Sequence, residues 1–278
     1  MTYFSPKRKK ILLACQGTRG DIQPNFAIAD GLRQAGYEPI IATATDYKSW
    51  VENSGFSWRK LGSDAKNFVT DPKIAQKLTG SPLSAVFNIQ GLLKKVLLSQ
   101  IEDLFDACEG VQAILFGAIV HGACDVAEAL RLPAIGTFIY PASPTSEFPC
   151  ALSPLKTLGP FLNKLSSKII LHNRLLHRNE ISAWRRDVLN LSPKPVTWES
   201  FTIEGKSVPK IYGFSKYLVP KPQDWSDQDH IAGFWFYEPS LSKEPDTEII
   251  KKILDFIEVG SKPVYVGFGS MRVPHHQE

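Results

Sequence analysis

Cysteine, long apolar runs and net charge are all scarce in this sequence of 278 residues. The four cysteines form no CxxC pair and show no metal-ligand spacing with the six histidines, which argues against a disulfide framework or a metal site. The formal net charge is +4, and no basic run is interleaved with aromatics, so nucleic acid is not an expected partner. No apolar run approaches the roughly 20 residues of a membrane span, and the run from Ile11 to Cys15 is too short for a signal-peptide core. These absences predict a cytoplasmic protein with buried free thiols.

Short apolar runs alternate with helical patterns over the first half of the chain. Continuous apolar runs are typical of parallel strands buried on both faces, and strands alternating with helices are typical of a doubly wound sheet. The sequence therefore predicts an α/β domain with a parallel sheet. The expected strands are 11–15, 39–44, 56–61, 113–116 and 133–138, and the expected helices are 22–35, 46–54, 83–108 and 125–130.

The second half of the chain is more irregular. A proline-rich loop at 140–160 precedes a helical pattern at 162–189, short β-like runs at 209–240 and a helix at 245–259. A strand is expected from Val264 to the turn at Ser270, and a lone strand needs a neighbour with which to pair. We therefore expect one domain over 1–239, a linker and helix over 240–262, and the first strand and turn of a truncated second domain over 263–278.

The glycine-rich turn at residues 17–21 follows the first expected strand. Ligands of open α/β sheets bind at the carboxyl ends of the strands, so this turn lies on the ligand-binding edge. Asp21 has two interpretations: a general base that projects into a cleft, or the N-cap of the next helix. The turn lacks GxGxxG, and no acidic residue ends the second strand, which disfavours a nicotinamide-dependent oxidoreductase.

Other candidate residues also have a functional and a structural interpretation. His121, after the 113–116 strand, is either a site residue or a structural one; Phe138 and Tyr140 line an apolar pocket or close the core. Asp125 lies at a helix start, where the dipole favours acids in any case. The closing turn Gly267-Phe268-Gly269-Ser270 is either a phosphate-binding loop or an ordinary strand exit. The helix at 162–189 has a basic face that is either solvated or in contact with a membrane surface, with Lys164, Lys168, Arg174, Arg178, Arg185 and Arg186.

Several segments, in this order, resemble the sterol glucosyltransferases and the glycopeptide and macrolide antibiotic glycosyltransferases. They are ILLACQGTRGDIQPNFAI at 11–28, GYEPIIATATDYKSWVENSGFSWRKLGSD at 36–64, VAEALRLP at 126–133, YGFSKYLVPKPQDWSD from Tyr212, IAGFWF at 231–236 and KPVYVGFGSM at 262–271. The resemblance implies a GT-B fold: two Rossmann-like domains, the first for an acceptor and the second for a nucleotide sugar. It covers nearly the whole chain and is weakest over 65–110 and 141–180.

The resemblance also implies a reaction and roles for single residues. A hexosyl group passes with inversion from a nucleotide sugar, typically UDP-glucose, to an acceptor hydroxyl, without metal or cofactor. Asp21 takes the place of the proposed base of the antibiotic-type members. Acceptor contacts are expected from Gly17, Thr18, Gly20, His121, Asp125, Phe138 and Tyr140, and donor-diphosphate contacts from Gly267, Gly269 and Ser270. Sterol-type members often carry His at the place of Asp125, with His121 four residues earlier here, so a His-assisted mechanism does not transfer.

Two functions remain open from the sequence. The first is transfer of a sugar to an apolar acceptor such as a sterol, another lipid or an aglycone, with the nucleotide sugar held by a C-terminal domain that this chain lacks. The second is a non-catalytic remnant that binds a lipid or sterol. A cytoplasmic location with peripheral membrane contact agrees with either.

Overall fold

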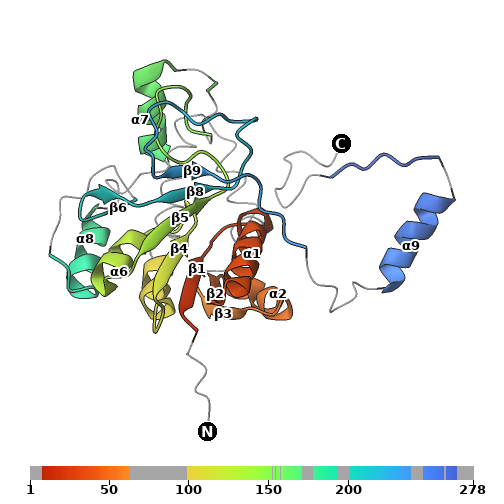
Figure 1. Ribbon diagram of the computed structural model, residues 1–278, viewed down its shortest axis with the longest axis horizontal. Helices are drawn as coiled ribbons and strands as arrows, with labels where there is room; N and C mark the ends of the chain where they lie inside the picture. Colours follow the sequence, from red (N-terminus) through yellow and green to blue (C-terminus); the bar gives the residue numbers. More distant parts are fainter. Residues whose placement is uncertain are drawn as a thin grey trace, which may run out of the picture.

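The computed structural model describes residues 8–62, 99–151, 153, 155–156, 158–170, 178–192, 201–238, 247–259 and 261–267. Its centre is a sheet of seven parallel strands in the order β3-β2-β1-β4-β5-β8-β9 (Figure 1). The strands are β1 Lys10–Ala14, β2 Glu38–Thr43, β3 Ser57–Lys60, β4 Ala113–Phe116, β5 Ala134–Phe138, β8 Lys210–Tyr212 and β9 Asp229–Ile231. The predicted Rossmann-like, doubly wound parallel sheet is confirmed.

The central strands of the sheet are buried on both faces because they are apolar on both sides, whereas the residues of the edge strand β3 are exposed or half-buried. In β1, Leu13 packs into a core under helix α1 (Arg19–Gln34) and helix α2 (Lys48–Asn53), together with Phe26 and Val51. Its neighbour Leu12 points the other way, into a larger core with helix α6 (Ala123–Leu130) and helix α8 (Arg178–Asp187). Alternate residues of a strand face opposite sides, so one continuous apolar run supplies both cores.

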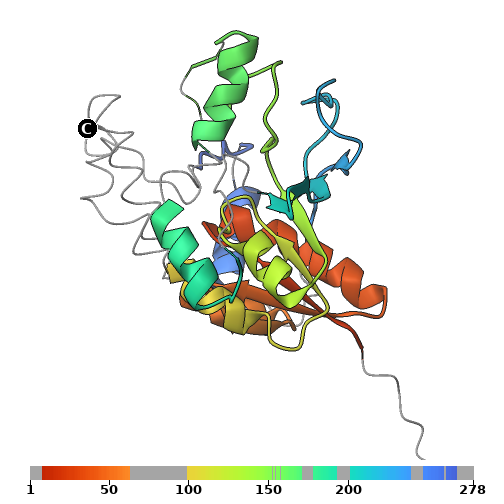
Figure 2. The ribbon, with the colours of Figure 1, turned by 90° about the vertical axis from the view of Figure 1, so that its left-hand side faces the viewer.

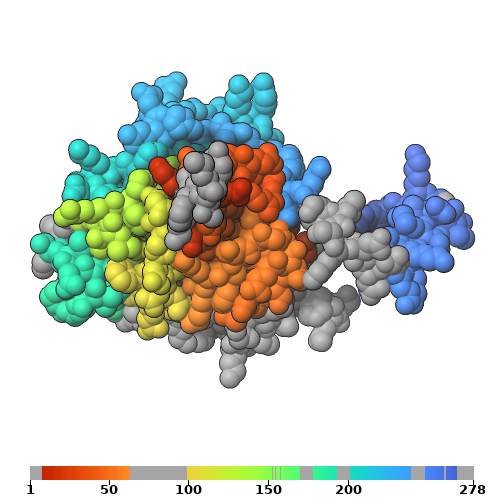
Figure 3. Space-filling view, turned by 60° about the horizontal axis from the view of Figure 1, so that its bottom comes forward, coloured from red at the N-terminus to blue at the C-terminus, as the bar shows by residue number. Residues whose placement is uncertain are grey.

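Several elements lie outside these two layers. A 3-10 turn, η1 (Thr45–Tyr47), precedes α2, and a small antiparallel hairpin pairs β6 (Thr202–Ile203) with β7 (Lys206–Ser207). Helix α7 (Pro160–Ile170) stands off the edge of the sheet in Figure 2. Helix α9 (Thr247–Glu258) projects clear of the main body, in blue in Figure 3. Among the described residues, no helix is both long enough and apolar enough to cross a bilayer.

The differences from the expected elements are local. The single helix expected over 162–189 is two helices, α7 and α8, in its described parts. Residues 99–107 are helical, and the rest of the helix expected over 83–108 lies outside the described residues. Among the short β-like runs expected at 209–240, the one at 231–235 is a strand only at its first residue, because β9 ends at Ile231. The strand expected from Val264 is not formed over 262–267, and no strand in the described part of the chain pairs with this segment.

The strand order reverses between β1 and β4, and this point is where the fold places a ligand. From β1 the chain runs outward through β2 and β3, then returns to β4 on the other side and runs outward again. Crossover connections leave this point in opposite directions, and open α/β sheets bind their ligands in the crevice outside the carboxyl ends of the strands at such a point, here β1 and β4. The segments that follow these two strands, residues 15–21 and 117–122, therefore lie on either side of the crevice.

A buried ion pair joins α6 to α8. The Arg185 guanidinium contacts Asp125 and lies 3.3 Å from a Glu128 oxygen, and the Arg185 and Asp125 side chains are each only 4% exposed. The solvated basic face expected for this helix is therefore wrong at Arg185, because the acids of α6 face it across the helix interface. Arg186, one residue later, is exposed and pairs with its neighbour Asp187.

Substituting Arg185 tests the importance of this pair. Arg185→Ala leaves the Asp125 carboxylate buried without its partner, so we expect the free energy of unfolding to fall by about 3–5 kcal/mol in urea denaturation. Arg186→Ala is the matched control, and its stability should equal that of the wild-type chain. Equal stabilities for the two variants would show that the pair is not part of the folded core.

Candidate active site

Asp21 lies in the first turn of α1, beside the crevice. Thr18 is the N-cap and Asp21 is the third residue of the helix, so the two form a capping box. The Thr18 backbone amide and hydroxyl donate to Asp21 Oδ2 at 2.7 and 3.0 Å. The N-cap role that the sequence left open for Asp21 thus belongs to Thr18. Because both bonds end on Oδ2, they set the rotation of the carboxylate while Oδ1 carries neither of them.

The surroundings of Asp21 make its carboxylate more basic than usual. Burial raises the pKa of Asp21 above the ordinary value of 3.8, and the hydrogen bonds from Thr18 oppose that rise. Burial also raises the pKa of the Tyr140 phenol, and the negative charge of Asp21 adds to this rise. Tyr140 therefore stays a neutral hydroxyl. A partly desolvated carboxylate with a raised pKa has the character that a general base requires.

Gly17 gives Asp21 the space that it occupies. The Gly17 backbone has φ of +120°, a conformation that other residues rarely adopt. A Cβ atom at this position would collide with the Asp21 carboxylate. Gly20, by contrast, lies in the helix, and a Cβ there would meet only the Thr18 hydroxyl at 3.8 Å.

His121 lies in the β4–α6 loop, on the other side of the crevice. Its backbone amide donates to the Gln100 side-chain oxygen at 2.8 Å, and the Gln100 amide donates to the Ile119 carbonyl at 3.1 Å. Gln100 is fully buried, and the β4–α6 loop contacts both the oxygen and the nitrogen of its side-chain amide. Gln100 was not among the residues predicted from the sequence. Its spacing, three residues after Leu97 and four before Leu104, places it on the apolar face of the expected helix and could have identified it.

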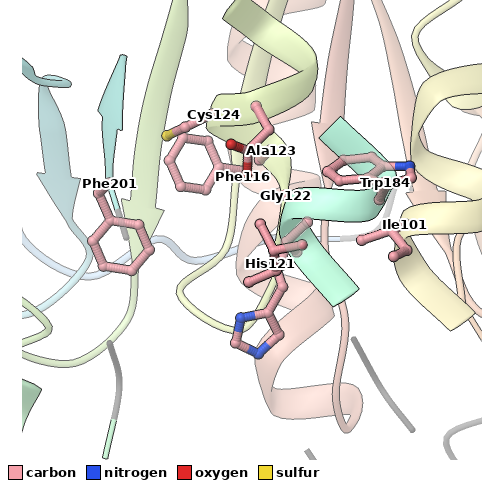
Figure 4. A pocket seen from close by; sticks show the side chains of 11 residues that line it. Ile101, Phe116, His121, Gly122, Ala123, Cys124, Trp184 and Phe201 are labelled. Carbon is pink, nitrogen blue, oxygen red and sulfur yellow. The ribbon is translucent and has the colours of Figure 1, made fainter. Parts of the chain in front are cut away.

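A small apolar cavity lies behind His121 (Figure 4). Its walls come from β4, α6, α8 and the helical residues 99–107, and Figure 4 shows the imidazole extending away from Phe116 and Cys124. The cavity has a volume of about 10 Å³, close to the room that one water molecule needs. The apolar side chains that line it are those of Ile101, Phe116, Val120, Ile181, Trp184 and Phe201.

The other predicted acceptor residues occupy different surroundings. Asp125 lines the same cavity, but its carboxylate is engaged by Arg185. Phe138 is buried among Phe116, Phe201 and Tyr212, which is the core role that the sequence left open for it. The structure thus brings Gly17, Thr18, Gly20 and Asp21 together in one turn, with His121 and Asp125 across the switch point; Tyr140 is linked to Asp21 only through the effect of its charge.

The predicted donor-diphosphate turn falls only partly within the described chain. Gly267 is exposed, whereas Gly269 and Ser270 lie outside the described residues. Within the described residues, no group of three or more His, Cys, Asp or Glu side chains is arranged to hold a metal ion. The four cysteines are buried thiols, as predicted, and none of them forms a disulfide.

The proline-rich loop after Tyr140 is tied down by polar contacts. Ser143 contacts the buried Tyr212 hydroxyl and Asp229, with oxygen–oxygen distances of 2.7 and 3.1 Å. Asp229 also pairs with buried Lys210 at 2.9 Å. Further along, Thr145 donates to Asp224 at 2.7 Å. These contacts join the loop to the strands and turn of residues 210–229.

A second residue missed from the sequence supports Asp21 from behind. Asn25 is buried, and its side-chain amide donates to the Asp21 backbone carbonyl at 2.9 Å. The Thr137 hydroxyl of β5 lies 3.5 Å from the Asn25 side-chain oxygen. The sequence does carry a signal for this role: Asn25 is a polar residue on the same helix face as the apolar Ile22 and Phe26, and a polar group in a core needs a hydrogen-bond partner.

Substitution of the two glycines of the turn separates their roles. We expect Gly17→Ala to lower the free energy of unfolding by about 1–3 kcal/mol, because it combines a strained backbone with a collision against Asp21. Gly20→Ala has space and a helical backbone, so its stability should equal or exceed that of the wild-type chain. Urea denaturation measures both, and a tolerated Gly17→Ala would contradict the placement of Asp21.

The raised pKa of Asp21 predicts a pH-dependent cost to folding. A folded pKa above 3.8 means that the folded chain holds this proton more tightly than the unfolded chain, so stability falls as pH rises past that value. Asp21→Asn removes the cost, so the stability of the variant relative to the wild type should rise with pH from about 4 until the folded pKa of Asp21 is passed, and then stay level. Urea denaturation from about pH 4 to about pH 7 measures the difference; a difference that does not change anywhere in this range would show that the pKa is not raised.

Comparisons with known proteins agree with this geometry. The model of the glycosyltransferase family 28 N-terminal domain matches residues 11–149, which are 139 of the 278 residues. The chain is 33% identical to sterol 3-beta-glucosyltransferase UGT80A2 of Arabidopsis thaliana, over 98% of this chain and 42% of the plant protein. It is 29% identical to O-mycaminosyltylonolide 6-deoxyallosyltransferase of Streptomyces fradiae, over 97% of this chain and 63% of that protein.

A solved structure gives the same picture for the fold. The calicheamicin glycosyltransferase CalG4 matches with a TM-score of 0.57 at 12% identity, over 86% of this chain and 56% of CalG4. At that identity the likeness shows the fold alone, and it agrees with the GT-B expectation. The chain thus spans less than half of its plant relative and about half of CalG4. From the family match over half of its length, the chain belongs to glycosyltransferase family 28.

Proposed function

We propose that this chain supplies the acceptor side of a glycosyltransferase that moves a hexosyl group from a nucleotide sugar to a hydroxyl of an apolar acceptor. The observation that carries the proposal is the Asp21 carboxylate, held by Thr18 at the switch point with its pKa raised. The names of the relatives, which act on sterols and a macrolide precursor, support an apolar acceptor with a hydroxyl group. A sterol or another lipid is our first choice of acceptor.

In the proposed reaction Asp21 acts as the base. Asp21 takes the proton from the acceptor hydroxyl while the hydroxyl oxygen attacks the anomeric carbon of the sugar. The bond from that carbon to the diphosphate oxygen breaks, its electron pair leaves with the nucleoside diphosphate, and the anomeric centre inverts. No step needs a metal ion. We propose UDP-glucose as the donor, bound by a second domain as the resemblance implies.

His121 and Tyr140 are proposed to contact the acceptor. Tyr140 is a neutral hydroxyl that feels the charge of Asp21, so it can donate a hydrogen bond to an acceptor bound near this carboxylate. His121 stands at the opposite side of the switch point, at the mouth of the apolar cavity. This cavity is smaller than any sterol, so the acceptor is expected to lie in the crevice in front of it.

The direct test is product formation. The chain is incubated with UDP-glucose and a panel of sterols and lipids, alone and then with a separately expressed donor domain of a relative, and glucosylated product is sought by mass spectrometry. Product under either condition supports transfer. Acceptor binding without product under both conditions contradicts transfer and supports the alternative, a non-catalytic binding domain.

Asp21→Asn tests the base in whichever preparation is active. We expect kcat to fall by about 10²–10⁴ while the KM for the acceptor changes little, because the variant keeps the shape of the side chain but cannot accept the proton. Asp30→Asn, on the exposed side of the same helix, is the matched control and should retain wild-type kcat. A kcat within tenfold of wild type for Asp21→Asn would contradict the assignment.

A further inference from the structure

Helix α7 buries polar side chains and exposes apolar ones, which is the opposite of an ordinary surface helix. Asn163 and Ser167 are only 5% and 3% exposed, whereas Phe161 is 78% exposed. With about 100° of rotation per residue, Phe161, Leu165, Ile169 and Leu162 fall within one arc of about 100°. The polar residues lie on the opposite side, toward the protein. The helix therefore presents an apolar stripe outward.

Specific contacts fix α7 in this orientation. The Asn163 side-chain amide donates to the Ser146 carbonyl at 2.9 Å, and the Cys150 amide donates to the Ser166 hydroxyl at 2.8 Å. Lys164 pairs with Asp224 at 2.9 Å. Rotating the helix to bury its apolar stripe would break all three contacts. The stripe is thus held outward by the fold, and Figures 1 and 2 show α7 standing away from the sheet.

The sequence that carries the stripe is basic, and Asp224, an acid of the neighbouring turn, is paired with Lys164. The sequence contains no Asp or Glu from Phe148 to Asn179, but it contains Lys156, Lys164, Lys168, Arg174 and Arg178. The same rotation of about 100° per residue places Lys164 and Lys168 next to Phe161 around the helix, along one edge of the stripe. A stripe of exposed apolar side chains bordered by cations matches an anionic lipid surface in both of its properties.

Helix α9 provides an internal comparison. It also exposes large apolar side chains, among them Ile253 and Phe256. Its charge differs, because Glu248, Asp255 and Glu258 outnumber Lys251 and Lys252. Exposed apolar area alone therefore does not distinguish the two helices, whereas attraction to an anionic surface does.

We propose that the α7 stripe is a docking surface for membranes that contain anionic lipids. Phe161, Leu162 and Ile169 enter the boundary between headgroups and acyl chains, and Lys168 beside them contacts the lipid phosphates and carboxylates. This inference goes beyond the proposed function, because binding to vesicles requires neither donor nor acceptor. If both hold, the crevice and the lipid acceptor are brought to the same surface.

Vesicle flotation of the whole 278-residue chain tests the proposal. The vesicles contain phosphatidylcholine alone or with phosphatidylserine, and the second set is also measured at high salt. We expect binding to the phosphatidylserine vesicles, much weaker binding to phosphatidylcholine alone, and loss at high salt. The double variant Phe161→Ser, Leu162→Ser should reduce the partition coefficient at least about tenfold, because it removes two large apolar side chains from the interface.

The matched control is the double variant Ile253→Ser, Phe256→Ser in α9, which should bind like the wild type. All four positions are exposed, so circular dichroism and urea denaturation should show unchanged folding. Binding lost through the α9 variant alone, binding indifferent to phosphatidylserine, or no vesicle binding would each overturn the proposal. So would a concentration-dependent dimer that the α7 variant abolishes in the absence of vesicle binding, because the stripe would then cover a second copy of the chain.

Discussion

Burial of the parallel sheet on both faces is the constraint on which the rest of this structure depends. A sheet covered by α1 and α2 on one side and by α6 and α8 on the other has no open face for chemistry. Only the loops at the strand ends remain accessible, and the reversal of strand order between β1 and β4 selects one place among them. The candidate base Asp21 and the candidate acceptor residue His121 are therefore found in the segments after these two strands, whereas Phe138 and Tyr140 belong to the neighbouring strand β5 and the loop after it.

The same constraint explains why the site carries strain and unfavourable burial. Asp21 is placed where water is partly excluded, which raises its pKa, and it fits only because residue 17 has no side chain. The capping box with Thr18 and the contact from Asn25 hold the carboxylate in this position. Local stability is lower than it could be, which is a common condition of catalytic groups.

Much of this architecture could be predicted from the sequence, because strand burial and helix periodicity are local properties. The run from Ile11 to Cys15 indicates a doubly buried strand without knowledge of its neighbours, and the turn with Asp21 follows from it. The pairing of Arg185 with Asp125 could not be predicted, because it depends on how α6 and α8 pack across 60 residues of sequence. Gln100 and Asn25 belong to the same class: each looks like a polar interruption of an apolar helix until its partner is located.

The anchoring of the proline-rich loop has a consequence for how this domain can diversify. Its first residues are fastened by Ser143 and Thr145 to side chains of the 210–229 segment, and those fastenings do not involve Asp21. Substitutions in the exposed part of this loop can therefore change what the loop presents to a ligand while the turn with Asp21 keeps its geometry. The fold in this way separates the segment that holds the candidate base from the segment that borders it, so the two can diverge independently.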